Sequence, residues 1–227
     1  MRSSARSSRF FTTVAVAAVV AVAIVAGLDA LRGDPAPVPA GVRGELVYAD
    51  DACRRHAVRL PDLARRDFLT VGCGVFTRRD NLGVRDGVVA WFAYPVPGGT
   101  TTLLRNPAVR GVAWLGGRRF AAVLAGGRLT IWEGERLLHE LERGSYRELR
   151  ASPAGTYFAA LDGSELAAFD REGLRIPIPT GRAVAWSPDE RFAVVARGDE
   201  LVVVAAGTGE TVARIEARAR DVDWRLP

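Results

Sequence analysis

Short apolar runs separated by turn residues follow one another through the C-terminal part of the chain. In residues 182–217 four such runs occur, and each is apolar or β-branched and is followed by Gly, Pro or Asp, except the last. This pattern is typical of β-strands. The middle runs are almost continuously apolar, which indicates strands covered on both faces, whereas the last alternates apolar with polar residues, as an outer edge strand does. The expected strands cover residues 182–186, 191–196, 200–205 and 210–217.

The same unit recurs upstream at about 35 residues, a period that indicates a solenoid, a propeller or an array. Equivalent second strands begin at Arg119-Phe120, Tyr157-Phe158 and Arg191-Phe192. Two complete upstream copies have expected strands at 109–114, 119–124, 128–132 and 136–142, and at 146–151, 157–161, 165–169 and 174–179. A weaker copy opens at Phe76, and its clearest strands are 88–94 and 100–105. We expect a repeat core formed by Trp114, Phe120, Phe158, Trp186, Phe192 and Trp224.

The two ends of the repeat region complement each other. Residues 45–49, 55–60 and 67–71 supply three strands but no opening strand, and residues 220–224 supply an opening strand with no unit behind it. Pairing the C-terminal strand with the N-terminal three would remove two exposed sheet edges. The sequence therefore predicts an all-β fold, a small β-propeller of about five four-stranded blades closed by this pairing. A monomeric closed ring is favoured, and an open stack or half of a dimeric propeller are the alternatives.

The N-terminal segment predicts a membrane anchor. Residues 1–9 are basic, with Arg2, Arg6 and Arg9, and the uncharged run from Phe10 to Leu28 would span roughly 28 Å as a helix, close to a bilayer core. The basic residues ahead of it place the N-terminus in the cytoplasm and the remaining chain outside. A cleaved signal peptide is the alternative, which would make the protein secreted. We therefore divide the chain into a cytoplasmic segment (1–9), a transmembrane helix (10–30), a Pro-rich linker (31–43) and the propeller (44–227).

Cys53 and Cys73 are the only cysteines. In an extracytoplasmic domain two thiols are expected to form a disulfide. Free thiols are one alternative. A zinc site with His56 is another, but it lacks a fourth ligand and a recognised spacing.

Charge does not indicate a nucleic-acid partner. The net charge is +5, but three of these charges lie in the first nine residues, and the other arginines alternate with acidic residues. A solvated surface explains this distribution better than phosphate recognition does.

Residues of the third well-formed copy resemble a known motif. Ala185-Trp186-Ser187-Pro188-Asp189, followed by Arg191-Phe192, is similar to the tryptophan-serine-proline-aspartate-glycine turn of TolB-like and WD-repeat-like β-propellers of bacterial envelopes. Glu190 stands where that motif has glycine, and the copies at Ser152 and Trp114 are more degenerate. The resemblance implies an extracytoplasmic binding platform or sensor domain, which is an argument by analogy.

Candidate catalytic chemistry is sparse. His56 and His139 fall on expected exposed strand positions, and no nucleophile elbow is present. Asp50-Asp51, Asp80 and Asp189 lie in turns, where aspartate is a usual turn residue. If they converged, they would serve a propeller glycan hydrolase or lyase, or bind calcium. Trp91 and Trp132 are expected either in the core or as anchors for a partner.

The sequence therefore predicts a membrane-anchored, extracytoplasmic propeller without enzymatic activity, cofactor or metal. Its expected partner is a protein or another cell-envelope component. Two alternatives remain: a propeller enzyme that uses the turn carboxylates, and an accessory subunit whose ring is completed by a partner.

Overall fold

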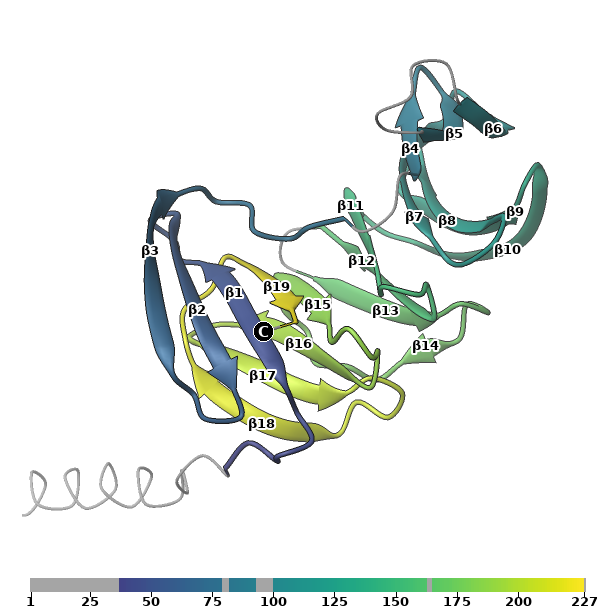
Figure 1. The fold of residues 1–227 in the computed structure, drawn as a ribbon. Helices are drawn as coiled ribbons and strands as arrows, with labels where there is room; N and C mark the ends of the chain where they lie inside the picture. Colours follow the sequence, from purple (N-terminus) through teal and green to yellow (C-terminus); the bar gives the residue numbers. More distant parts are fainter. Residues whose placement is uncertain (1–36, 79–81, 93–99, 163–164, 227) are drawn as a thin grey trace, which may run out of the picture. The chain divides into compact units, whose positions relative to one another are not determined.

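The strands form antiparallel sheets, and every sheet except the one that holds β19 is built from strands consecutive in the chain (Figure 1). The computed structural model describes residues 37–226 except 79–81, 93–99 and 163–164, so the predicted anchor and most of the predicted linker lie outside the described residues. Within those limits the strands are β1 (Gly44–Ala49), β2 (Arg54–Leu60), β3 (Arg65–Val71), β4 (Leu82–Arg85), β5 (Val88–Phe92), β6 (Thr100–Arg105), β7 (Val109–Trp114), β8 (Arg119–Leu124), β9 (Arg128–Glu133), β10 (Arg136–Arg143), β11 (Glu148–Ala151), β12 (Tyr157–Leu161), β13 (Leu166–Asp170), β14 (Arg175–Ile176), β15 (Ala183–Trp186), β16 (Phe192–Arg197), β17 (Glu200–Ala205), β18 (Thr211–Glu216) and β19 (Asp221–Arg225).

Four sheets have four strands each, and the fifth has three among the described residues. We number these sheets as blades. Blade 1 has the order β19-β1-β2-β3, blade 2 is β4-β5-β6, blade 3 is β7 to β10, blade 4 is β11 to β14, and blade 5 is β15 to β18. Among the described residues, no helix is long and apolar enough to cross a bilayer.

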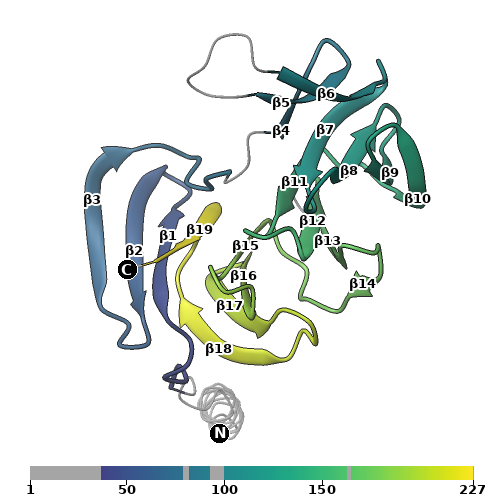
Figure 2. The same ribbon diagram turned by 45° about the vertical axis from the view of Figure 1, so that its right-hand side comes forward.

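The predicted closure of blade 1 is confirmed. Strand β19 pairs with β1 in antiparallel register from Glu45 opposite Arg225 to Ala49 opposite Asp221. Both ribbon views show the C-terminal strand beside the N-terminal one (Figures 1 and 2). Trp224 is fully buried, and its indole Nε1 donates to the carbonyl of Arg43 at 3.1 Å. The last described strand therefore completes the first sheet.

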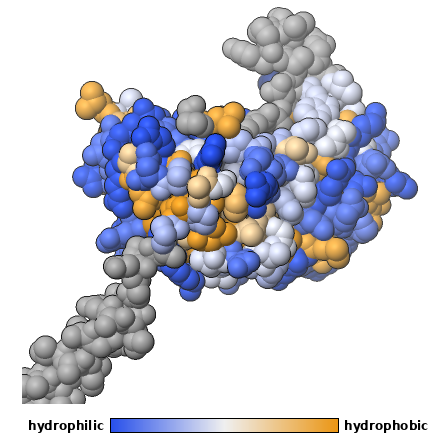
Figure 3. Space-filling view, turned by 60° about the horizontal axis from the view of Figure 1, so that its bottom comes forward, coloured by the Kyte–Doolittle hydropathy of each residue, from blue (hydrophilic) through white to orange (hydrophobic). Residues whose placement is uncertain are grey.

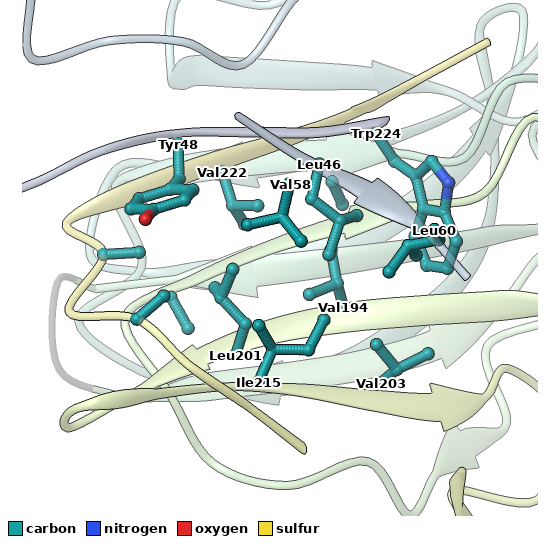
Figure 4. Close-up of a cluster of buried hydrophobic side chains, with 14 of the residues drawn as sticks. Leu46, Tyr48, Val58, Leu60, Val194, Leu201, Val203, Ile215, Val222 and Trp224 are labelled. Carbon is teal, nitrogen blue, oxygen red and sulfur yellow. The ribbon is translucent and has the colours of Figure 1, made fainter. Parts of the chain in front are cut away.

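Apolar clusters join successive blades. The largest combines blade 1 and blade 5, and Figure 4 shows Leu46 and Val58 facing Val194, Leu201 and Ile215. Further clusters join blade 5 to blade 4, blade 4 to blade 3, and blade 3 to blade 2. Each sheet thus buries an apolar face against a neighbouring sheet, as the repeat pattern requires.

The six expected core residues differ in burial. Phe120, Phe158 and Trp224 are fully buried, and Trp186 is 2% exposed. Trp114 and Phe192 are partly buried and pack against the edges of two clusters. The indole of Trp91 meets that of Trp114 edge to face at 5.8 Å between ring centroids. Trp91 and Trp132 both pack against the cluster between blades 2 and 3, which favours core packing over an exposed partner anchor.

Two predicted strands are wrong. The opening strand expected at Phe76 is absent among residues 72–78, because the amides of Val75 and Phe76 donate to the carboxylate of Asp221 instead of to a sheet. Blade 2 therefore begins at β4. The strand expected at 174–179 shrinks to the two residues of β14. Pro177 and Pro179 follow, and proline has no amide to donate to a sheet.

Cys53 and Cys73 form the predicted disulfide, 20 residues apart in sequence and with Cα atoms 4.3 Å apart. Because both sulfurs are bonded to each other, the zinc and free-thiol alternatives do not apply. The bond joins the turn after β1 to the segment that leaves β3, and the Gly72 amide donates to the Cys53 carbonyl at 2.8 Å beside it. The segment leading to blade 2 is thereby fixed to blade 1.

Replacing Trp224 with alanine will test the closure of blade 1. Removing a fully buried tryptophan costs about 3–5 kcal/mol of unfolding free energy, and Trp224→Ala should show this loss in urea denaturation. Leu226→Ala is the control, because that side chain is 74% exposed. Equal stability of the two variants would contradict the role assigned to the pairing of β1 with β19.

Reduction of the disulfide should lower the melting temperature. For a closed loop of this size the chain-entropy treatment gives about 3 kcal/mol, or roughly 6–12 °C for a domain of this length. Calorimetry with and without a reductant measures the shift. A double variant with serine at positions 53 and 73 should melt at the lower temperature in both conditions, and a reductant-dependent shift in that variant would disprove the explanation.

Candidate functional site

A charged cavity of about 760 Å³ is lined by residues of β11 and β19, the inner (opening) strands of blades 4 and 1, and by residues of the segments that connect strands. Its lining includes four arginines, Arg78, Arg150, Arg182 and Arg220. Three carboxylates, those of Asp51, Glu148 and Asp221, also line it. The cavity is therefore polar, with one more basic than acidic group in its lining.

Arg150 and Asp221 form a buried ion pair at this cavity. Arg150 lies on β11 of blade 4 and Asp221 on β19 of blade 1, and both are at least nine-tenths buried. The Arg150 Nη1 atom is 2.8 Å from Asp221 Oδ1, and its Nε donates to Glu148 Oε1 at 2.7 Å. A buried guanidinium needs such partners, since an unpaired buried charge is costly.

Further contacts of Arg150 reach two other parts of the chain. Its Nη1 also donates to the carbonyls of Val184 on β15, at 3.2 Å, and Val222 on β19, at 3.4 Å. The guanidinium carbon lies 4.4 Å from the centre of the Phe76 ring, a cation–π contact. One side chain thus holds inner strands of blades 4, 5 and 1 together with the segment that leads to blade 2.

The second oxygen of Asp221 fixes that segment. Asp221 Oδ2 accepts from the backbone amides of Val75 at 2.6 Å and Phe76 at 3.0 Å. Slightly further along, Arg78 Nη2 donates to the carbonyl of Val112 on β7 at 2.9 Å. Residues 75–78 therefore connect blade 1 to blade 3 through hydrogen bonds at the cavity.

The rim of the cavity is built around Asp51, in the turn after β1. Its Oδ1 is 3.0 Å from Arg182 Nη1, and its Oδ2 is 2.6 Å from Arg218 Nε. Arg182 precedes β15, and its Nε donates to the carbonyl of Ala219 at 2.7 Å. Arg220, just before β19, is exposed and lines the same cavity. The rim therefore brings together side chains from three places far apart in sequence.

The carboxylates considered for catalysis do not form a common site in the described part of the chain. Asp189 accepts from the Ser187 hydroxyl at 2.6 Å and from the Arg191 amide at 3.2 Å, which makes it part of a turn. Burial would raise the pKa of Asp189, but these hydrogen bonds and the Arg191 charge lower it below its usual value. Asp51 lines the cavity, and Asp80 lies outside the described residues.

Asp50 has a similar structural role. Desolvation would raise its pKa, but hydrogen bonds from the Arg54 amide and side chain and from His56 lower the pKa of Asp50 to about 2. His56 Nδ1 lies 2.6 Å from Asp67 Oδ1, and the imidazole stacks on the Tyr48 ring. A carboxylate ionised so far below neutrality is a poor general acid or base near pH 7.

The other histidine, His139, is exposed on β10, as its alternating sequence position predicts. Within the described ranges, no group of three or more His, Cys, Asp or Glu side chains is placed to hold a metal ion.

Of the charged residues that line the cavity, only Asp51 is singled out by the sequence. Asp51 lies in a turn, whereas Glu148 and Arg150 on β11, and Asp221 and Asp223 on β19, occupy alternate positions of inner strands. The equivalent positions on β7 and β15 hold only Gly or Ala. Charged residues at alternate positions of an otherwise buried strand were the available signal, because such charges must be paired inside the fold.

No protein-family profile and no curated protein matches the chain. Among solved structures, the computationally designed Ika8 protein is similar over 78% of this chain and 61% of its own, at 14% identity and a TM-score of 0.45. The Cps50 (Swd1) β-propeller domain of Myceliophteria thermophila is similar over 80% of this chain and 73% of its own, at 14% identity and the same TM-score of 0.45.

A chain of the mitotic checkpoint complex is similar over 76% of this chain and 63% of its own, at 14% identity and a TM-score of 0.44. The protein thus spans about three-fifths of the designed protein that it matches. The propeller-type arrangement of this protein is shown by its succession of antiparallel sheets and by the pairing of β1 with β19.

Asp221→Asn will test the ion pair at the cavity. Removing one charge of a buried pair leaves the other uncompensated, which costs about 3–5 kcal/mol. Asp199→Asn is the matched control, because the Asp199 side chain is 84% exposed. Chemical denaturation should show a large loss for the first variant and almost none for the second. A loss for Asp221→Asn no larger than that of the control would refute the structural role of the pair.

Proposed function

We propose that this protein is a membrane-anchored, extracytoplasmic propeller of the TolB-like type that binds a protein or another envelope component without catalysing a reaction. The observation that carries the proposal is the charged cavity, about 760 Å³ in volume, on a scaffold of antiparallel sheets. Clefts of roughly 300–1,000 Å³ are the usual size for ligand recognition. The scaffold supplies rigidity, and the loops at the rim supply contacts.

The groups that line the cavity support binding over catalysis. Asp221 is paired with Arg150 and with two backbone amides, and Asp51 is paired with Arg182 and Arg218. Glu148 bonds to Arg150. Each of the three carboxylates already has an arginine partner within the protein. These groups are suited to holding charge in fixed positions.

The membrane location is supported by the sequence, and the extracytoplasmic side also by the disulfide. The uncharged run from Phe10 to Leu28 is long enough for a bilayer helix. Disulfides persist in oxidising compartments, and Cys53 is bonded to Cys73. The Pro-rich linker would set the distance between the bilayer and the propeller.

The test uses the full-length chain in its native membrane, with a photo-crosslinking amino acid placed at Arg218 on the rim. Arg218 is 68% exposed, so the substitution removes its ion pair with Asp51 at the rim but no core contact. We expect a discrete crosslinked adduct, and retention of the chain in membranes after an alkaline wash. The control places the same crosslinker at Leu137 on β10, which is 46% exposed and lies away from the cavity lining.

Two results would refute the proposal. One is an identical pattern of adducts from Arg218 and Leu137, which would mean that the rim has no specific partner. The other is turnover of envelope glycan or peptide substrates by the purified full-length protein, lost on substitution of the cavity carboxylates. Release of the chain by the alkaline wash would contradict the proposed membrane anchor but not the proposed binding function.

A further inference from the structure

A second, smaller space shares one lining residue with the cavity. A space of about 300 Å³ is lined by Arg182, Arg197, Asp199 and Arg218 among others, and Arg182 lines the larger cavity as well. The two spaces therefore share one arginine, and the ion pair of Asp51 with Arg218 links their linings. We propose that they form one binding site for an acidic segment of a partner protein, held through its carboxylates by the rim arginines.

The arginines of the rim have unused hydrogen-bonding capacity. Asp51 is shared between Arg182 and Arg218, so one carboxylate serves two guanidinium groups. Arg197 and Arg220 are exposed, and within the described ranges neither guanidinium has a hydrogen-bond or ion-pair partner. The rim thus presents guanidinium donors that have no hydrogen-bond acceptor within the described part of the protein.

Guanidinium groups select a particular ligand chemistry. An arginine presents donors in a planar fork that matches a carboxylate with two parallel hydrogen bonds. In a concave site such pairs are partly shielded from solvent, which makes them stronger than on an open surface. Carboxylates of aspartate or glutamate in a peptide fit this arrangement.

Acidic groups at the same site favour a peptide over a phosphate polymer. Asp51 and Asp199 stand between the rim arginines, and Glu148 lies deeper in the larger cavity. The phosphates of a nucleic acid or an anionic membrane bring negative charge but no hydrogen-bond donor for these carboxylates, which leaves the repulsion uncompensated. A peptide brings carboxylates for the arginines and backbone amides that donate to the remaining acidic groups.

The backbone holds the rim in place before a ligand arrives. A Cβ added at Gly181 would lie 2.4 Å from Val195 Cγ1 and 2.6 Å from the Ala196 carbonyl, so only glycine lets this segment approach β16. Arg182 follows directly, and its Nε donates to the Ala219 carbonyl. The Arg220 amide donates to the carbonyl of Ala49 at 2.7 Å. Preorganised donors lose less entropy on binding than mobile ones.

This inference rests on the proposed binding function and adds the chemistry of the partner. Its test measures fluorescence anisotropy of a labelled peptide of alternating glutamate and alanine, added to the full-length protein in a non-ionic detergent at physiological ionic strength. The matched probe replaces every glutamate with glutamine. We expect binding of the glutamate peptide, weaker binding at high salt, and no measurable binding of the glutamine peptide.

Arg220→Ala should weaken binding of the glutamate peptide about tenfold or more, the effect of losing charge-assisted hydrogen bonds. The affinity of Arg220→Lys for the glutamate peptide should lie between those of the unchanged protein and Arg220→Ala, because lysine keeps the charge but not the planar fork. Arg197→Ala is a second, independent variant with the same expected direction. Arg143→Ala is the control, since Arg143 is exposed on the outer strand β10 and is not among the residues that line either space.

Several outcomes would overturn the inference. They are the absence of peptide binding, equal binding of the glutamine peptide, and equal effects of Arg220→Ala and Arg143→Ala. Tighter binding of oligothymidylate or of phosphatidylserine vesicles, lost in Arg220→Ala, would assign the site to a phosphate ligand instead. If the rim crosslinks to a partner while the acidic peptide fails to bind, the proposed binding function is retained. Only the inference that the partner segment is acidic is then rejected.

Discussion

The antiparallel pairing of β19 with β1 is the constraint on which the rest of the structure depends. It supplies the fourth strand of blade 1, and it places Val222 and Trp224 in the apolar cluster shared with blade 5. It also sets the position of Asp221, which fixes Arg150 and the amides of residues 75–76. The cavity is thus a consequence of how the first sheet is completed.

Apolar packing and buried charge have separate tasks in this fold. Clusters between successive blades account for most of the buried side chains, and they are built from repeated residue types such as Ala, Val and Leu. The inner ends of the strands instead carry Arg150, Asp221 and Asp223, all buried and paired. On the face shown in Figure 3, hydrophobic side chains gather in a patch that hydrophilic side chains border. Packing specifies the blades, and charge specifies how their inner edges meet.

Local patterns predicted most of the strands, because apolar periodicity and turn residues act over a few positions. The alignment of Phe120, Phe158 and Phe192 located second strands of three blades, and the missing opening strand predicted the pairing of β1 with β19. The opening strand predicted at Phe76 does not form, because the amides of Val75 and Phe76 bond to Asp221, which is distant in the sequence. The cavity could not be predicted for the same reason, since Asp51, Arg182 and Arg218 meet only in the folded chain.

The order of the strands has a consequence for biosynthesis. Until residues 221–225 have been synthesised and can pair, blade 1 keeps an open edge at β1, with unpaired backbone amides and carbonyls along it. Domains emerging at a ribosome bury such edges late when the pairing partner is distant along the chain. The growing chain therefore passes through an interval in which the edge of β1 is open to other partners, for example a chaperone, before β19 pairs with it.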